Sequence, residues 1–230
     1  MRFSFIAIAS AVAASVAFAA PVRVSKKSLS GTINILNFAL TLEHLEDAFY
    51  KEGLSRYDEA DFVMAGYKGV IRDRFVHIGE HEATHVTTLE TVIKSMNEAP
   101  VAKCTYKFPF QDVHQFIAIA RALENTGVSA YLGQAAGLDG DLLTAAASIA
   151  TVEARHSSFL NEVLGETGLP YAFDTPLTAK EIFTIASYFI EYCPDNIGLV
   201  PFKQLTASIG KDDKVTASFE DEDTSVTTWC

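Results

Sequence analysis

Two apolar helical patterns, each with a Glu-x-x-His sequence at its centre, constrain the fold of this chain more than any other feature. Around Glu82 and His85, and again around Glu153 and His156, apolar residues recur at alternating steps of three and four. This spacing places them on one face of an α-helix, with the Glu and His in the middle of that face. Because an unpaired carboxylate is costly to bury, the pattern predicts that these polar centres meet oppositely charged partners.

Helical periodicity extends over most of the chain. Within residues 31–165 apolar residues follow a 3.6-residue period, and no stretch alternates convincingly as a strand does. The pattern predicts long helices at about 31–53, 68–97, 112–136 and 140–164, and a short one at about 58–66. A fifth helix is expected from the Thr178-x-x-Glu181 capping box to near Tyr192. We therefore expect an all-α fold, a four-helix bundle with an additional C-terminal helix, within residues 31–200.

The other two long helices supply further carboxylates. Glu124 interrupts the apolar face of the third helix, while Glu43 and Glu46 lie beside or within that of the first. Tyr50 follows Glu43 by seven residues, and Tyr131 follows Glu124 by seven. The chain thus reads twice as Glu-x6-Tyr followed by Glu-x-x-His, which indicates an internal duplication of a helix pair. Each tyrosine is expected either to donate a hydrogen bond to a ligand carboxylate or to be a core aromatic with another polar partner.

The chemistry of such a cluster points to metal ions. Four buried glutamates carry four negative charges, which two divalent cations balance while two neutral histidines act as ligands. Oxygen and nitrogen ligands without a thiolate suit iron or manganese, with zinc as an alternative. One Glu from each of two helices and a Glu-x-x-His from each of the other two form the ligand set of dinuclear carboxylate sites in bundles. The expected cofactor is a pair of divalent metal ions, iron first.

Four segments carry these motifs. They are ILNFALTLEHLEDAFY (35–50), GEHEATHVTTL (79–89), ALENTGVSAYLG (122–133) and TVEARHSSFL (151–160). In them the chain resembles the ferritin-like superfamily, and specifically the secreted ferritin-like domain proteins of fungi, which are related to desiccation-related and stress-response proteins. FDTPLT (173–178) and EYCP (191–194) are similar to the fungal branch, and the resemblance covers roughly residues 33–200.

The resemblance implies which residues bind the metal. Those ligands would be Glu82, His85, Glu124, Glu153 and His156, with one further Glu from the first helix. The Glu-x6-Tyr pattern favours Glu43 and the apolar face favours Glu46, so both stay candidates. If the site is catalytic, the implied activity is an oxidoreductase reaction of Fe(II) with dioxygen or peroxide, in stress protection. The alternative is a non-catalytic ferritin-like module in which the metal is structural or absent.

The sequence HEATH (81–85) also matches the His-Glu-x-x-His helix of zinc metalloproteases. In such a protease both histidines bind zinc and the glutamate is the general base. That interpretation leaves Glu124, Glu153 and His156 without a role, and no Gly-x-x-His continuation follows the motif. A zinc metalloprotease is therefore the minor alternative.

The ends of the chain indicate export. Residues 1–19 carry an early Arg, a short apolar run and a small-x-small site, which is typical of a cleaved secretory signal. We expect a secreted protein, with the cell wall as another location, and no membrane anchor after cleavage. In an oxidising compartment the loop residues Cys104 and Cys193 are expected to form a disulfide, which leaves Cys230 over. The polar, acidic tail at 211–230 is expected to be disordered.

Charge and motif content limit the partners. The chain has 18 Lys and Arg against 29 Asp and Glu, a formal net charge of −11. Nucleic acids and anionic membranes favour clustered positive charge, so neither is an expected partner. No Gly-x-Ser-x-Gly sequence, phosphate-binding glycine loop or dinucleotide fingerprint occurs. Metal ions are the expected partners, and the sequence defines no oligomeric state.

Overall fold

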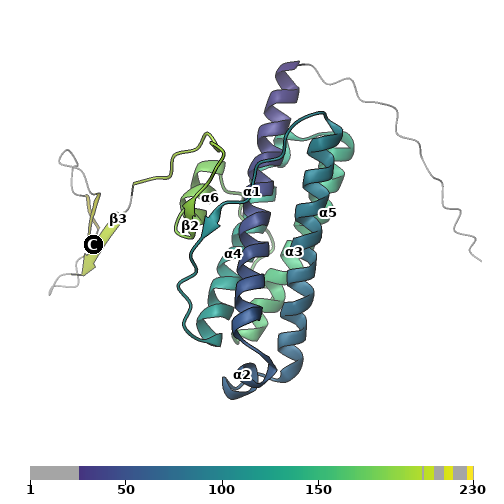
Figure 1. The fold of residues 1–230 in the computed structure, drawn as a ribbon. Helices are drawn as coiled ribbons and strands as arrows, with labels where there is room; N and C mark the ends of the chain where they lie inside the picture. Colours follow the sequence, from purple (N-terminus) through teal and green to yellow (C-terminus); the bar gives the residue numbers. More distant parts are fainter. Residues whose placement is uncertain (1–25, 204, 210–214, 220–226, 230) are drawn as a thin grey trace, which may run out of the picture.

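The chain forms a bundle of four long helices (Figure 1). The computed structural model describes residues 26–203, 205–209, 215–219 and 227–229. The long helices are α1 (Lys26–Arg56), α3 (Gly69–Ser95), α4 (Val113–Gln134) and α5 (Gly140–Val163). The shorter ones are α2 (Glu59–Met64), α6 (Ala179–Ala186) and the 3-10 turn η1 (Ala135–Gly137). The predicted helical bundle is confirmed, with α6 as the additional helix.

Local sequence explains where several helices begin and end. The Asp58 carboxylate accepts a hydrogen bond from the Asp61 backbone N–H, and the Asp61 carboxylate accepts one from the Asp58 backbone N–H, which caps α2. Thr178 and Glu181 form the same capping box at α6, as their spacing predicts. Beyond the end of α5, Gly165 has a φ of 80°, a left-handed conformation that glycine adopts without a steric penalty.

The apolar core differs between the two ends of the bundle. We call one the aromatic end, after its fully buried rings: Phe49, Phe62, Phe75 and Phe116. We call the other the aliphatic end, after a separate cluster of buried side chains: Ile33, Leu36, Leu40, Leu89 and Ile93. In both α1 and α3 the Glu and His residues of the sequence motifs fall between these clusters. The polar centre of the bundle therefore lies between two apolar layers.

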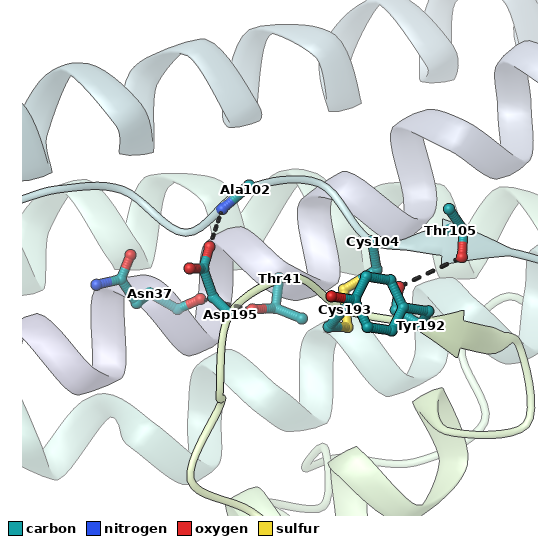
Figure 2. Close-up of a disulfide and its surroundings, with 8 residues drawn as sticks. All are labelled: Asn37, Thr41, Ala102, Cys104, Thr105, Tyr192, Cys193 and Asp195. Atoms are coloured by element: carbon teal, nitrogen blue, oxygen red, sulfur yellow. Dashed lines mark hydrogen bonds between the residues drawn. A yellow bond between two sulfur atoms is a disulfide. The ribbon is translucent and has the colours of Figure 1, made fainter.

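A disulfide joins the connection before α4 to the segment after α6 (Figure 2). Cys104 and Cys193 are bonded, which confirms the predicted pair. Beside it, β1 (Thr105–Tyr106) pairs antiparallel with β2 (Ile190–Tyr192). The prediction that the fifth helix extends to near Tyr192 is wrong, because α6 ends at Ala186. Pairing with β1 next to the disulfide holds the following residues in an extended form instead.

Two hydrogen bonds fix the same connection to its surroundings. The Asn37 side chain of α1 accepts a hydrogen bond of 2.9 Å from the Val101 backbone N–H. The Asp195 carboxylate accepts one of 2.6 Å from the Ala102 backbone N–H, which Figure 2 shows beside the disulfide. The long crossover between α3 and α4 is thereby held both to α1 and to the segment after α6.

The described residues near the C-terminal end form strands and not helices. The signal predicted at residues 1–19 lies outside the described residues. An antiparallel sheet is formed by β3 (Leu205–Ile209), β4 (Val215–Phe219) and β5 (Thr227–Trp229). Strands β4 and β5 fall within the tail for which disorder was expected, and the alternation in VTASF is a pattern that suits a strand. Within the described part of the chain, no helix has the length and apolar character needed to cross a bilayer.

Candidate metal centre

All seven candidate ligands lie buried at the middle of the bundle, where the four long helices meet. Helix α1 contributes Glu43 and Glu46, α3 contributes Glu82 and His85, α4 contributes Glu124, and α5 contributes Glu153 and His156. Three of the glutamates are 0% exposed, and no member of the set exceeds 7%. Side chains that are ordinarily solvated are thus concentrated in the core, as the interrupted apolar faces predict.

Six of these side chains form two groups that share two members. Glu43, Glu82, His85 and Glu153 form one group, and Glu82, Glu124, Glu153 and His156 form the other. Within each group one ligand atom per residue lies within 4.8 Å of all the others. Glu82 and Glu153 belong to both groups, so they have the placement of carboxylates that bridge two ions. The residues that the groups do not share are one Glu and one His in each, and these would complete the ligands of one ion each.

Each histidine turns the same ring nitrogen, Nδ1, toward the carboxylates. His85 Nδ1 lies 3.1 Å from Glu82 and 3.2 Å from both Glu43 and Glu153. His156 Nδ1 lies 3.0 Å from Glu124 and 3.2 Å from Glu82. Each histidine thus contacts the outer glutamate of its own group and the shared Glu82, which agrees with a duplicated helix pair.

Two tyrosines hold the outer carboxylates of the cluster. The Tyr50 hydroxyl donates a hydrogen bond of 2.5 Å to Glu124, and the Tyr131 hydroxyl donates one of 2.5 Å to Glu43. Tyr50 on α1 thus binds the glutamate of α4, and Tyr131 on α4 binds the glutamate of α1. The sequence allowed two roles for these tyrosines, and the contacts agree with the first, in which each hydroxyl donates a hydrogen bond to a candidate ligand carboxylate. Such donors fix the orientation of a carboxylate that binds a metal.

Burial governs the acid–base behaviour of most of the carboxylates. Removal from water raises the pKa of Glu43 to about 7, although the hydrogen bond with His85 opposes this. Burial also raises the pKa of Glu46 and Glu153 well above the usual range, and the neighbouring glutamates add to both shifts. For Glu82, burial raises the pKa, but hydrogen bonds with the two histidines outweigh it and bring the pKa to about 2.

The histidines shift in the opposite direction. Burial alone would lower the pKa of His85, but hydrogen bonds with Glu153 and the other carboxylates raise it to about 12. The pKa of His156 is raised to about 9 for the same reason, with Glu124 as its main partner. In the protein alone, protons on the imidazoles and on the deepest carboxyls therefore balance the charge of the cluster. Divalent ions would replace those protons.

The polar atoms in the middle of the cluster test whether metal ions fit. Among the described residues, Glu153 Oε2 is buried with no hydrogen-bond or ion-pair partner, whereas Glu153 Oε1 and Glu82 Oε1 each have only an imidazole nitrogen at 3.2 Å. These are the two residues shared by the two groups, and buried oxygens of this kind are rarely left without a partner. A pair of cations between the groups would satisfy all three oxygens, so the residues present fit a dinuclear metal site.

Glu46 and Gly127 break the symmetry of the two halves. Glu46 follows Glu43 by three residues and belongs to neither ligand group, although it is buried beside them. Gly127 takes the equivalent place after Glu124. A Cβ atom at Gly127 would lie 2.8 Å from Glu153 and 3.2 Å from Glu46, so only glycine leaves room for both carboxylates. The role of Gly127 was not predicted from the sequence, although its position three residues after Glu124, equivalent to that of Glu46 after Glu43, could have indicated it.

His81 makes a second contact that was not predicted from the sequence. Its Nδ1 atom lies 2.9 Å from His156 Nε2, and the two rings stack at 5.2 Å between centroids. His81 thus contacts Nε2 of His156, whereas the carboxylates contact Nδ1 of the same ring. The repeated sequence pattern does not predict this contact, because the residue on α5 that is equivalent to His81 is Val152. His81 also lines a cleft of about 770 Å³ together with His85 and His156, which brings the histidine edge of the cluster close to solvent.

The same geometry bears on the protease interpretation of residues 81–85. In a zinc protease His81 and His85 would bind one ion together. Here His85 faces the carboxylates, whereas His81 faces His156 and belongs to neither ligand group of the described residues. The arrangement therefore favours the dinuclear site over the protease site.

A four-helix bundle with this carboxylate and histidine cluster defines a class, the carboxylate-type dinuclear helix bundles. The family profile described as a ferritin-like domain matches residues 31–166, and the chain belongs to that family. The match includes all seven candidate ligands. The chain is also 28% identical over 163 residues to Protein rds1 of the fission yeast Schizosaccharomyces pombe. That alignment covers 69% of this chain but only 39% of the relative, so the chain spans well under half of its length.

Proposed function

We propose that this chain is a secreted ferritin-like metalloprotein that holds two divalent ions in its bundle core and oxidises Fe(II) with dioxygen or peroxide. Iron is the first expectation, with manganese and zinc as alternatives. The observation that carries the proposal is the sharing of Glu82 and Glu153 between the two ligand groups. Two overlapping groups, each completed by one Glu and one His, have the composition of a dinuclear site and not of two separate mononuclear sites.

The residues of the chain have distinct tasks in this proposal. Two Fe(II) ions together would supply two electrons, which with two protons reduce dioxygen to hydrogen peroxide, or hydrogen peroxide to two waters. Glu43 and Glu124 would bind one ion each, and the hydroxyls of Tyr131 and Tyr50 would keep them oriented. Burial of the cluster excludes bulk water, which strengthens the interaction of the carboxylates with cations.

Secretion and stress protection belong to the proposal as well. The leader-like composition of residues 1–19 supports export, and so does a disulfide joining Cys104 and Cys193, since such bonds persist in oxidising compartments. Removal of Fe(II) together with an oxidant would protect a cell surface from oxidative damage, which links the chemistry to a stress role. Secretion is checked by culture-medium fractionation and N-terminal sequencing, with cleavage after residue 19 as the expected result.

Elemental analysis of the purified secreted protein tests the metal site. The expected result is about two metal ions per chain, lost in Glu153→Gln, which keeps the shape of the side chain but removes its charge. Glu80→Gln is the matched control, because Glu80 lies on α3 but is exposed and pairs with His77 outside the cluster. Absence of metal, together with no uptake from Fe(II), Mn(II) or Zn(II) solutions, would overturn the proposal.

An oxygen electrode separates catalysis from a structural role of the metal. If the protein oxidises Fe(II), oxygen consumption in the presence of Fe(II) exceeds that of the metal-free solution and falls to the background rate with Glu153→Gln. A large metal-dependent rise in the melting temperature without oxygen or peroxide consumption would instead support the non-catalytic module. A metal held at a thousand times its dissociation constant adds about 4 kcal/mol to the stability.

A further inference from the structure

The aliphatic end of the bundle contains a cavity next to the carboxylate cluster. It has a volume of about 40 Å³ and receives side chains from all four long helices. Among the residues that line it are Ala39, Leu42, Val92, Ala130, Ala146 and Ile149. The aromatic end, in contrast, contains four fully buried phenylalanine rings, whereas one phenylalanine, Phe38, lines the cavity.

The cavity reaches the cluster through residues that adjoin the ligands. Leu42 directly precedes Glu43 in the sequence, and Tyr131, whose hydroxyl donates to Glu43, also forms part of the cavity wall. Ile149 lies one helical turn before Glu153 on α5, which is a rise of about 6 Å. The cavity therefore adjoins the half of the cluster that contains Glu43.

The lining disfavours water as an occupant. Among the lining residues only Thr88, Tyr131 and Gln134 carry polar side-chain atoms. The Thr88 hydroxyl donates to the Thr84 backbone carbonyl, and the Tyr131 hydroxyl donates to a carboxylate, so both donors are already engaged. Of the three polar side chains, only the Gln134 amide is left as a partner for a water. An ordered buried water needs about two to four polar partners, and apolar cavities without them stay dry. The cavity suits a small apolar molecule.

The volume limits the size of that molecule. A single water needs about 10–15 Å³ of such space, while a cavity of about 150 Å³ holds benzene. At about 40 Å³ the cavity admits a molecule of two or three heavy atoms and excludes an aromatic ring. We propose that it is a binding site for dioxygen, from which dioxygen reaches the cluster beside Tyr131. The binding stands on the cavity itself, whereas its use as the source of an oxidant depends on the proposed function.

Xenon binding tests the site without any reaction. Xenon occupies dry apolar cavities, and in the protein as purified it is expected to shift the methyl NMR signals of Val92, Leu142 and Ile149. Ala146→Leu, which fills the cavity, should abolish these shifts, and Ala39→Val serves as a second, smaller filling change. Ala147→Leu is the matched control, because it adds the same atoms at an exposed position on the same helix. Absence of these shifts in the natural sequence, or their persistence in both filled variants, overturns the site.

Oxidation kinetics test the use of the cavity. Ala146→Leu should raise several-fold the dioxygen concentration needed for half-maximal Fe(II) oxidation, while anaerobic oxidation by hydrogen peroxide, a polar molecule, stays unchanged. Ala147→Leu should leave both unchanged. Equal losses with the two oxidants, or no loss with dioxygen, overturn the route. If the natural sequence oxidises no Fe(II) at all, the proposed function fails, and the xenon result alone then decides whether the cavity binds a gas.

Discussion

The aromatic and aliphatic ends of the bundle carry the same duplicated sequence pattern but differ in how tightly it is packed. At the aromatic end, Tyr50 donates to Glu124 while its ring lies among three phenylalanines. At the aliphatic end, Tyr131 makes the equivalent hydrogen bond to Glu43, but its ring borders the cavity. Among the described residues, one phenylalanine, Phe38, lines that cavity together with Tyr131. The repeated sequence pattern thus pairs the ligands, while the two different apolar layers make their surroundings unequal.

This inequality assigns different tasks to the two ends. The group that contains Glu43 and His85 adjoins the cavity, whereas the group that contains Glu124 and His156 adjoins the phenylalanine layer. A densely packed layer holds ligands still, because interiors at crystal-like density leave side chains few alternative positions. Around the cavity the packing density is lower, so the neighbouring side chains are held less firmly. We interpret the aromatic end as the support of the centre and the aliphatic end as the side from which a small reactant arrives.

Truncation of one side chain at each end gives the largest expected contrast. Phe116→Ala should lower the free energy of unfolding by about 3–5 kcal/mol, because the ring is fully buried among other rings. Leu142→Ala should cost less than about 2 kcal/mol, since Leu142 is half-buried and already borders a cavity. Urea unfolding of both variants measures the difference. Equal losses would show that the two ends are packed alike.

The pH dependence of metal binding compares the two histidines. Metal ions bind neutral imidazole, and the pKa values are about 12 for His85 and about 9 for His156, so below pH 9 both rings must lose a proton on uptake. Glu43 and Glu153, whose pKa values burial raises, lose their protons to the ions as well. Affinity should therefore fall steeply as the pH falls below 9, and less steeply above pH 9, where the ring of His156 is already neutral. Titration calorimetry in buffers of different ionisation enthalpy counts the released protons. Uptake at pH 7 without proton release would contradict this account.

Filling the space at Gly127 tests the centre between the two ends. Gly127→Ala places a methyl group against Glu153 and Glu46, so metal affinity should fall by about 10- to 100-fold. Helix propensity favours alanine over glycine by about 1 kcal/mol, so the helix itself should not be weakened. Gly31→Ala is the control, because no atom lies within 4 Å of the added methyl. Competition with a chelator measures the affinities, and equal affinity in the two variants would show that the carboxylates tolerate the methyl group.

Much of the bundle could be predicted because periodicity reports burial directly. The expected helix at 68–97 is found at Gly69–Ser95, and the one at 140–164 is found at Gly140–Val163. The short strands β1 and β2 could not be predicted in this way. They contain two and three residues, and their pairing depends on the crossover and the disulfide and not on any local pattern. The same pairing explains why α6 is shorter than its apolar pattern suggested.

Within the centre, the sequence predicted which polar residues are buried together but not what surrounds them. Interrupted apolar faces and the repeated Glu-x6-Tyr spacing pointed to the cluster, because each feature follows from helix geometry alone. The contact of His81 with His156 and the room made by Gly127 depend on how α3, α4 and α5 approach one another. The cavity depends on side chains from four helices at once, so no single segment carries a signal for it.

The two tyrosines give the smallest and most direct test of the contrast between the ends. Tyr50→Phe removes the donor to Glu124 at a fully buried position, and leaving a buried carboxylate oxygen unpaired should cost about 1–3 kcal/mol. Tyr131→Phe removes the equivalent donor to Glu43, but the Tyr131 ring borders the cavity, so the looser surroundings of Glu43 can adjust and the loss should stay at about 1 kcal/mol.

Urea unfolding of the protein as purified measures both tyrosine variants, since each change keeps the ring and removes one oxygen atom. A larger loss for Tyr50→Phe means that the aromatic end holds its carboxylate in the more rigid surroundings. A larger loss for Tyr131→Phe would reverse the assignment of support and access, because the end beside the cavity would then be the more rigid one. Equal losses would mean that the duplicated hydrogen bonds have stayed equivalent while the layers around them diverged.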